Sequence, residues 1–149
     1  MYNLAFFLGE LELDSQRKVL SGAAEAARAD GNNIVVYALT LSPDDKYNDG
    51  ESASMLYDDF SSYDGFIIYA ESIYSEKIRN VVMNKIREQH KPSASIDFTI
   101  DGMINVSSDN EGAMRILSRH LLDKHHVKTA NFIGGPEDSV DAVTRKRVF

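Results

Sequence analysis

The sequence predicts an α/β fold, with an open, mostly parallel sheet and helices on both of its faces. Apolar runs of four to six residues alternate along the chain with longer segments that have helical spacing. Most runs are continuously apolar, as expected of strands buried on both faces of a parallel sheet. Strands that alternate with helices form right-handed βαβ units. The expected strands are residues 3–8, 33–38, 65–70, 93–98, 103–106 and 129–134.

Three segments between the expected strands carry an apolar stripe with helical spacing. In residues 15–29 the stripe ends just before Gly31, and Asp14 or Ser15 is expected to cap the start of the helix. Residues 75–89 form the second such segment.

The third helical segment comprises residues 109–125. Ser108 and Glu111 have the spacing of a capping box at its start. After the last apolar run, the polar residues up to Phe149 are also expected to be helical.

The composition is that of one ordinary globular domain. Of 149 residues, 43% are hydrophobic and 26% are charged. A net charge of −7 argues against a nucleic-acid-binding surface, and the lack of cysteine excludes disulfides, thiolate metal sites and a cysteine nucleophile. No apolar run reaches membrane-spanning length, and the N-terminus lacks the basic region of a signal peptide. We therefore expect a cytoplasmic protein without a membrane partner.

Motifs for catalysis and for phosphate binding are missing from the sequence. The turn "GGPEDS" (134–139) matches neither of the glycine-rich phosphate-binding patterns. Pro136 removes an N–H group there, and Glu137 and Asp138 would repel an anion. A G-x-S-x-G nucleophile elbow is absent as well. The chain is thus expected to have no catalytic activity and to bind no cofactor.

The histidines do not have the spacing expected of a metal site. His120, His125 and His126 lie near one end of an expected helix, and His90 lies near the end of another. Two ligands on one helix face are expected four positions apart, whereas His120 and His125 are five apart. Surface histidines favoured by the helix dipole are the simpler interpretation, so no metal site is predicted.

Ligands of open parallel sheets bind outside the carboxyl ends of the strands. Here these ends carry carboxylates, hydroxyls and small residues, which suit hydrogen bonds to a hydroxyl-rich small molecule better than to phosphate. Solvation, or a capping or turn role, is the alternative interpretation of the acids. The residues concerned are Glu10, Glu12 and Asp14 after the first strand, Glu71 and Ser72 after the third, and Asp97 at the end of the fourth.

An ordered set of motifs resembles the effector-binding domain of the lactose-repressor/galactose-repressor (LacI/GalR) family, and the resemblance spans essentially the whole chain. Val148 departs from the family pattern R-x-x-G-[FYW], in which glycine is expected, and "ELELDSQ" (10–16) replaces the usual asparagine-proline-phenylalanine loop. The motifs that carry the resemblance are "YDGFIIYAES", "KPSASID", Asp109-Asn110, His120-Leu121, Gly135-Pro136 and Arg145.

The resemblance implies a type I periplasmic-binding-protein-like fold, in which two α/β subdomains close on a small molecule. Residues 1–106 would form most of the N-terminal subdomain. Residues 107–149 would form only the first helix, strand and helix of a truncated second subdomain. By position, Asp97 would contact effector hydroxyls and Arg145 would reach into the cleft, although Arg145 could instead be a surface helical arginine. The expected effector is a sugar or a related polar metabolite.

The function implied is effector sensing by a bacterial transcriptional regulator. Such a protein is expected to form a homodimer and to contact DNA only through a domain that this chain lacks. Alternatively, "DSQRKVLSGAAEAAR" (14–28) is similar to the sensor half of signalling proteins that end in a diguanylate cyclase domain. Its catalytic domain would then follow residue 149. Both alternatives imply signal transduction, with no catalysis in this chain and only weak effector binding by it.

Overall fold

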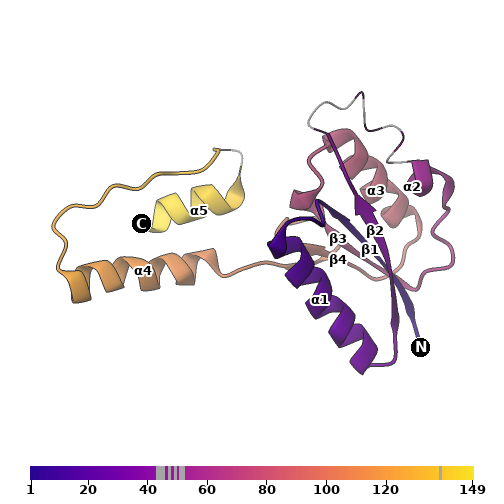
Figure 1. The fold of residues 1–149 in the computed structure, drawn as a ribbon, viewed down its shortest axis with the longest axis horizontal. Coiled ribbons are helices and arrows are strands. Elements are labelled where there is room, and N and C mark those ends of the chain that lie inside the picture. Colours follow the sequence, from indigo (N-terminus) through magenta and orange to yellow (C-terminus); the bar gives the residue numbers. More distant parts are fainter. Residues whose placement is uncertain (43–45, 47, 49, 51–52, 138) are drawn as a thin grey trace. The chain divides into compact units, whose positions relative to one another are not determined.

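The computed structural model describes residues 1–149 except 43–45, 47, 49, 51–52 and 138 (Figure 1). The chain divides into two compact units, residues 1–107 and residues 108–149. The assignment of these units to two subdomains of a larger sensor stays a prediction.

The first unit is built on a five-stranded sheet in the order β2-β1-β3-β4-β5. Every neighbouring pair of strands is parallel, which confirms the predicted sheet. The strand ends differ from the expected ones by at most two residues. The strands are β1 (Asn3–Gly9), β2 (Asn33–Leu39), β3 (Gly65–Tyr69), β4 (Ser93–Ile96) and β5 (Ile104–Val106).

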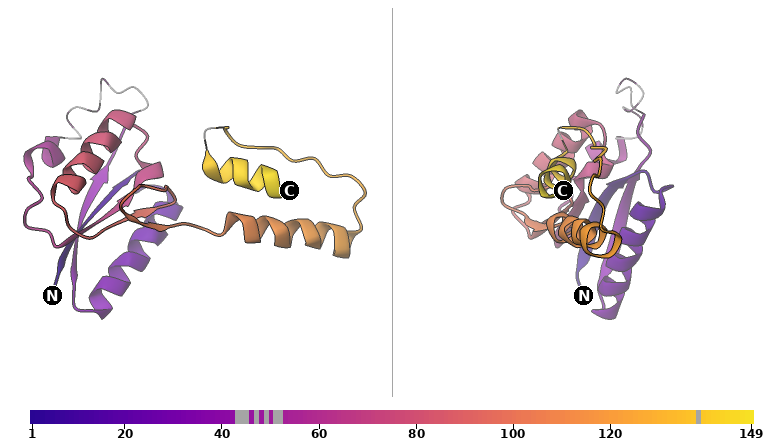
Figure 2. Two further views of the ribbon diagram at one scale, coloured as in Figure 1. Left: turned by 180° about the vertical axis from the view of Figure 1, so that it is seen from behind. Right: turned by 90° about the vertical axis from the view of Figure 1, so that its left-hand side faces the viewer.

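Helices cover both faces of this sheet (Figures 1 and 2). The crossover from β1 to β2 runs in the opposite direction along the sheet from the crossover between β3 and β4. Right-handed crossovers in opposite directions place their helices on opposite faces. Accordingly, α1 (Asp14–Ala29) lies on one face, and α2 (Ala53–Tyr57) and α3 (Glu76–Glu88) lie on the other.

The start of α1 differs from the prediction. Its N-cap residue is Leu13, which makes no side-chain capping bond, so neither Asp14 nor Ser15 is the cap. Asp14 instead lies in the first turn, where its carboxylate contacts the Lys18 Nζ atom at 2.6 Å. A negative charge there is favoured by the helix dipole. In α3, by contrast, the Ser75 hydroxyl accepts a hydrogen bond from the Ile78 N–H at 3.2 Å.

The main core lies on the sheet face covered by α2 and α3. Phe7, Phe60 and Phe66 are buried there, and the Phe7 ring stacks on Tyr37 with centroids 4.8 Å apart. The Tyr37 hydroxyl bonds the Asp58 carboxylate and lies 2.7 Å from the Tyr63 hydroxyl. The polar ends of the aromatic cluster are thus satisfied, as burial requires.

The polar strand β4 joins the sheet because its buried hydroxyl has a partner. Ser95 is fully buried, and its Oγ atom donates to the Asn105 Oδ1 atom of β5 at 2.5 Å. The same oxygen accepts a hydrogen bond from the Ile100 N–H at 2.8 Å. The hydrogen bond between Ser95 and Asn105 and the backbone hydrogen bonds of the sheet together offset the cost of burying polar groups in this strand.

The described residues of the second unit form two helices, α4 (Asn110–His125) and α5 (Val140–Val148). The expected strand at residues 129–134 is wrong, since the described residues of this unit contain no strand. A strand needs a neighbour to pair its backbone groups, and the unit offers none. Ile133 is accordingly 96% exposed.

The start of α4 also differs from the predicted capping box. The Asp109 side chain is the cap and accepts a hydrogen bond from the Gly112 N–H at 2.8 Å. Glu111 instead contacts Arg115 at 2.6 Å and Arg147 at 3.2 Å. Asp138, which would repel an anion in the turn before α5, lies outside the described residues.

Candidate functional site

Three acidic residues follow adjacent strands at one edge of the sheet. Glu10 follows β1, Glu71 lies in the 3₁₀ turn η2 (Ala70–Ser72) after β3, and Asp97 follows β4. Because β1, β3 and β4 are neighbours and parallel, their carboxyl ends lie side by side. All three residues are half-buried. This carboxyl edge is where an open parallel sheet binds ligands.

Two of these acids have an unusual backbone conformation. The φ angles of Glu10 and Asp97 are 52° and 55°, in the left-handed region. The Glu10 N–H still donates to the Leu39 carbonyl at 3.0 Å, and the Asp97 N–H donates to the Val106 carbonyl at 2.8 Å. Each acid therefore closes the ladder of its strand and turns the chain there. A non-glycine residue costs about 1 kcal/mol or more in this conformation, which the neighbouring strands sustain.

Tyr74 also belongs to this edge, although the sequence analysis did not single it out. Its hydroxyl donates to the Glu10 carboxylate at 2.7 Å, and its side chain is 55% exposed. The hydrogen bond to Glu10 raises the pKa of Tyr74, with a smaller contribution from burial. The feature of the sequence that could have identified Tyr74 was its position, as an aromatic residue in the loop expected after the third strand. Its contact with the first-strand loop is a tertiary property.

A second exposed ring, Phe98, lies in the loop after β4. The guanidinium of Arg79 lies over it at 5.5 Å and donates to the Ile73 carbonyl at 3.2 Å. Exposed aromatic rings beside a few polar groups are typical of small-molecule sites. The loops after β3 and β4 supply both the exposed aromatic rings and the polar groups.

The Ser72 hydroxyl is used within the protein. It donates to the Tyr69 carbonyl at 2.6 Å and accepts a hydrogen bond from the Gly9 N–H at 2.8 Å. Ser72 is buried, and it joins the ends of β1 and β3. Its predicted contact with a ligand stays a prediction.

Glu12 and Asp14 are both exposed at the beginning of α1. The carbonyl of Glu12 accepts a hydrogen bond from Arg17 at 3.1 Å. The Asp14 carboxylate is hydrogen-bonded to Lys18 and to Arg17, and these bonds lower the pKa of Asp14. The contacts of Asp14 thus support the helix, and a ligand-binding role for either acid stays a prediction.

Arg145 belongs to the second unit, whereas the predicted acids belong to the first. Its Nε atom donates to the Asn110 side-chain oxygen at 2.6 Å, and its Nη2 atom donates to Asp141 at 3.1 Å. The arginine and the asparagine of two separate sequence motifs are therefore in direct contact. The role of Arg145 in a cleft stays a prediction.

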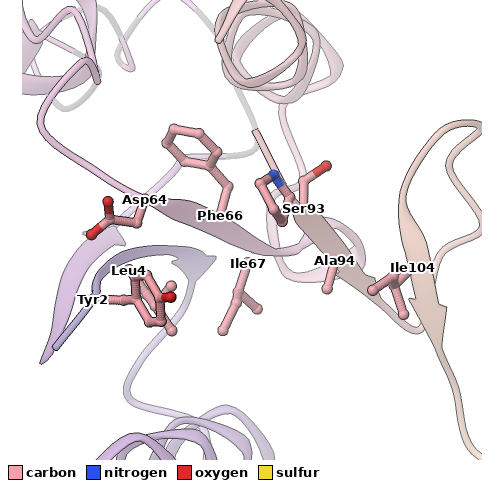
Figure 3. A pocket seen from close by; sticks show the side chains of 10 residues that line it. Tyr2, Leu4, Asp64, Phe66, Ile67, Ser93, Ala94 and Ile104 are labelled. Carbon is pink, nitrogen blue, oxygen red and sulfur yellow. The ribbon is translucent and has the colours of Figure 1, made fainter. Parts of the chain in front are cut away.

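An open cavity of about 380 Å³ lies on the sheet of the first unit (Figure 3). Leu4, Ile67, Ala94 and Ile104 line it, and Ile104 is 68% exposed. Its lining is mainly apolar, so it does not suit a hydroxyl-rich ligand. None of the predicted site residues lines this cavity.

Two further kinds of feature are absent from the part of the chain that the structure describes. There, no three histidine, cysteine, aspartate or glutamate side chains are grouped to hold a metal ion. None of the helices found there is both long and apolar enough to cross a membrane.

No protein-family model matches the sequence, and no curated protein matches it. Two solved structures have a similar architecture. One is a periplasmic binding protein/LacI transcriptional regulator from Alkaliphilus metalliredigens QYMF, complexed with D-xylulofuranose (TM-score 0.64, 18% identity). The other is an ABC sugar transporter subunit from Rhodobacter sphaeroides 2.4.1 (TM-score 0.69, 13% identity). In both comparisons the likeness covers 99% of this chain and 50% of the other.

This chain has the type I periplasmic-binding-protein-like fold. The fold implied by the sequence motifs is thereby confirmed. The chain spans about half the length of both solved structures. At these identities the likeness establishes the type I periplasmic-binding-protein-like fold alone, and membership of the LacI/GalR family stays a prediction.

Proposed function

We propose that this chain binds an uncharged, hydroxyl-rich small molecule, a sugar or a related metabolite, at the carboxyl edge of its sheet. The observation that carries the proposal is the convergence of Glu10, Glu71 and Asp97 at the ends of three adjacent strands. Carboxylates accept hydrogen bonds from sugar hydroxyls. The exposed ring of Tyr74, bonded to Glu10, adds an apolar face. The likeness to a protein complexed with D-xylulofuranose and to an ABC sugar transporter subunit supports this ligand class.

Charge narrows the ligand class further. Residues 1–107 contain 17 acidic and 9 basic residues, a formal charge of −8. Two cationic groups of the elements that follow β1 and β3 have partners within the protein: Lys18 contacts Asp14, and Arg79 bonds the Ile73 carbonyl. A phosphorylated sugar would therefore meet mainly like charge, which disfavours binding.

A nuclear magnetic resonance titration of the ¹⁵N-labelled chain would test this site, because it detects weak binding. We expect neutral pentoses or hexoses to shift the amide signals of the loops after β1, β3 and β4, and their phosphate esters to shift them less. Asp97→Ala should abolish these shifts. Asp101→Ala removes an exposed carboxylate a few residues away and should retain them. Stronger binding of the phosphate esters would contradict the proposal, as would equal shifts in both variants.

For the whole protein, we infer sensing by a LacI/GalR-type transcriptional regulator without catalysis. Two other roles each have one observation in their favour. The resemblance of residues 14–28 to diguanylate cyclase sensors favours a signalling enzyme. The likeness to an ABC sugar transporter subunit favours a solute-binding role in transport. The neighbouring coding sequence would distinguish them, because a regulator requires a DNA-binding domain and a signalling enzyme requires a cyclase domain.

A further inference from the structure

Two histidine rings meet at the carboxyl end of α4. The Nε2 atoms of His120 and His125 are 3.0 Å apart, and the ring centroids are 4.8 Å apart. Both residues are exposed and belong to the second unit, whereas the carboxyl edge proposed to bind the sugar belongs to the first. The sequence spacing of five argued against a shared metal, yet the two nitrogens face each other.

The end of the helix holds this pair in place. His125 is the last residue of α4, and His126 follows in the left-handed conformation, with a φ angle of 49°. The His126 N–H donates to the Leu122 carbonyl at 3.1 Å, and the Val127 N–H donates to the Leu121 carbonyl at 3.3 Å. The bond from His126 is the single closing bond of an αL C-cap, with His126 as its left-handed residue. Backbone hydrogen bonds therefore hold the last turn of α4, independently of the imidazoles.

We propose that His120 and His125 together bind a divalent late first-row transition ion, Ni²⁺ or Cu²⁺, through their Nε2 atoms. Imidazole nitrogens lie about 2.0–2.1 Å from such an ion. Two nitrogens at right angles around it are then about 2.9 Å apart, whereas tetrahedral ligands are about 3.3 Å apart. The observed 3.0 Å matches adjacent positions of a square-planar or octahedral ion. Water completes the coordination.

The protons are accounted for without a further reactant. Without metal, an Nε2–H group of one ring donates to the Nε2 lone pair of the other. An ion needs both lone pairs, so each neutral ring keeps its proton on Nδ1 when the ion binds. The side chains of Arg119, Asp123 and Lys124 on the same turns carry a net charge of +1. They are exposed, so solvent screens their repulsion of the ion.

Calorimetric titration of the untagged full chain with Ni²⁺, at about pH 8 where histidine is neutral, tests the site. We expect one Ni²⁺ ion per chain. His120→Ala and His125→Ala should each weaken binding about 100-fold, because the second imidazole otherwise binds intramolecularly. The matched controls are His126→Asn and His90→Asn. Both replace a histidine at a positive φ angle with a residue that tolerates it, and both should leave the affinity unchanged.

Paramagnetic resonance of the Cu²⁺-loaded chain supplies a second readout. We expect hyperfine coupling to two imidazole nitrogens, reduced to one in either alanine variant. Thermal melting without metal should show both variants folded, since the replaced side chains are exposed. Unchanged Ni²⁺ affinity in either alanine variant would overturn the proposal. So would loss of binding in His126→Asn, or tighter binding of Zn²⁺ than of Ni²⁺.

Discussion

The backbone N–H of Gly9 donates a 2.8 Å hydrogen bond to the hydroxyl of Ser72, 63 positions further along the chain. Both residues are buried, and the two chain segments approach so closely that a Cβ atom added at Gly9 would lie 1.9 Å from the Ser72 carbonyl oxygen. The contact joins the ends of β1 and β3 next to Glu10 and Glu71. The proposed ligand site therefore depends on a buried contact between two distant chain segments.

Gly9→Ala should be strongly destabilising, by about 3 kcal/mol or more, because backbone atoms would have to move. Gly22→Ala is the matched control. Its added Cβ meets nothing within 4 Å in α1. The control should stabilise the protein by about 0.5–1 kcal/mol, because alanine is a better helix former than glycine. Urea unfolding measures both changes. Equal stability of the two variants would contradict the rigid contact.

Ser72→Ala removes the acceptor of the buried Gly9 N–H without creating a clash. We expect a loss of about 1–3 kcal/mol in the free energy of unfolding, the cost of an unsatisfied buried donor. Ser21→Ala, at an exposed position of α1, should change it by no more than about 0.5 kcal/mol. A Ser72→Ala protein as stable as the Ser21→Ala protein would show that water replaces the hydroxyl.

Stability should fall at alkaline pH through Tyr37. Burial, followed by its bonds to Asp58 and Tyr63, raises the pKa of Tyr37 well above its ordinary value of 10.0. The folded state thus holds the phenolic proton more tightly than the unfolded chain does. This contribution is complete below pH 10.0 and is lost as the pH rises toward the pKa of the folded state.

Denaturation at several pH values tests this dependence. For one tyrosine the slope is at most about 1.4 kcal/mol per pH unit. Tyr37→Phe should flatten the decline above pH 10, at the cost of lower stability near neutrality. Tyr74→Phe should leave most of the decline in place, because Tyr74 is exposed. An unchanged slope in Tyr37→Phe would assign the decline to other groups.

The second unit should promote self-association. Ile116 is 73% exposed, and Leu117 and Ile133 are exposed as well. Such apolar surface favours contact between chains. Light scattering should show a mass that rises with concentration, and the double variant Ile116→Lys, Ile133→Lys should reduce this rise. Asn131→Lys adds a charge at an exposed polar position and should not. A monomer at all concentrations would contradict the prediction.

Most of the first unit could be predicted from local sequence. The continuous apolar runs around Phe6, Phe7 and Ile68 indicated strands buried on both faces, and these residues are fully buried. The same reasoning failed at residues 129–134, because an apolar run does not specify the strand that must pair with it. Sequence spacing also placed Glu10, Glu71 and Asp97 at or just beyond the ends of their strands, since a strand end is a local feature.

The sequence by itself determined the spacing of apolar residues in each segment. That spacing indicated the parallel α/β architecture and placed acids at the strand ends. Only the tertiary structure decided which distant groups meet: Tyr74 with Glu10, Ser72 with Gly9, and Arg145 with Asn110. It also decided that His120 and His125 face each other across a helix end. The physical reason is that the apolar pattern of a strand or a helix is set by a few neighbouring residues. A hydrogen bond between distant residues depends instead on the positions of two chain segments in space.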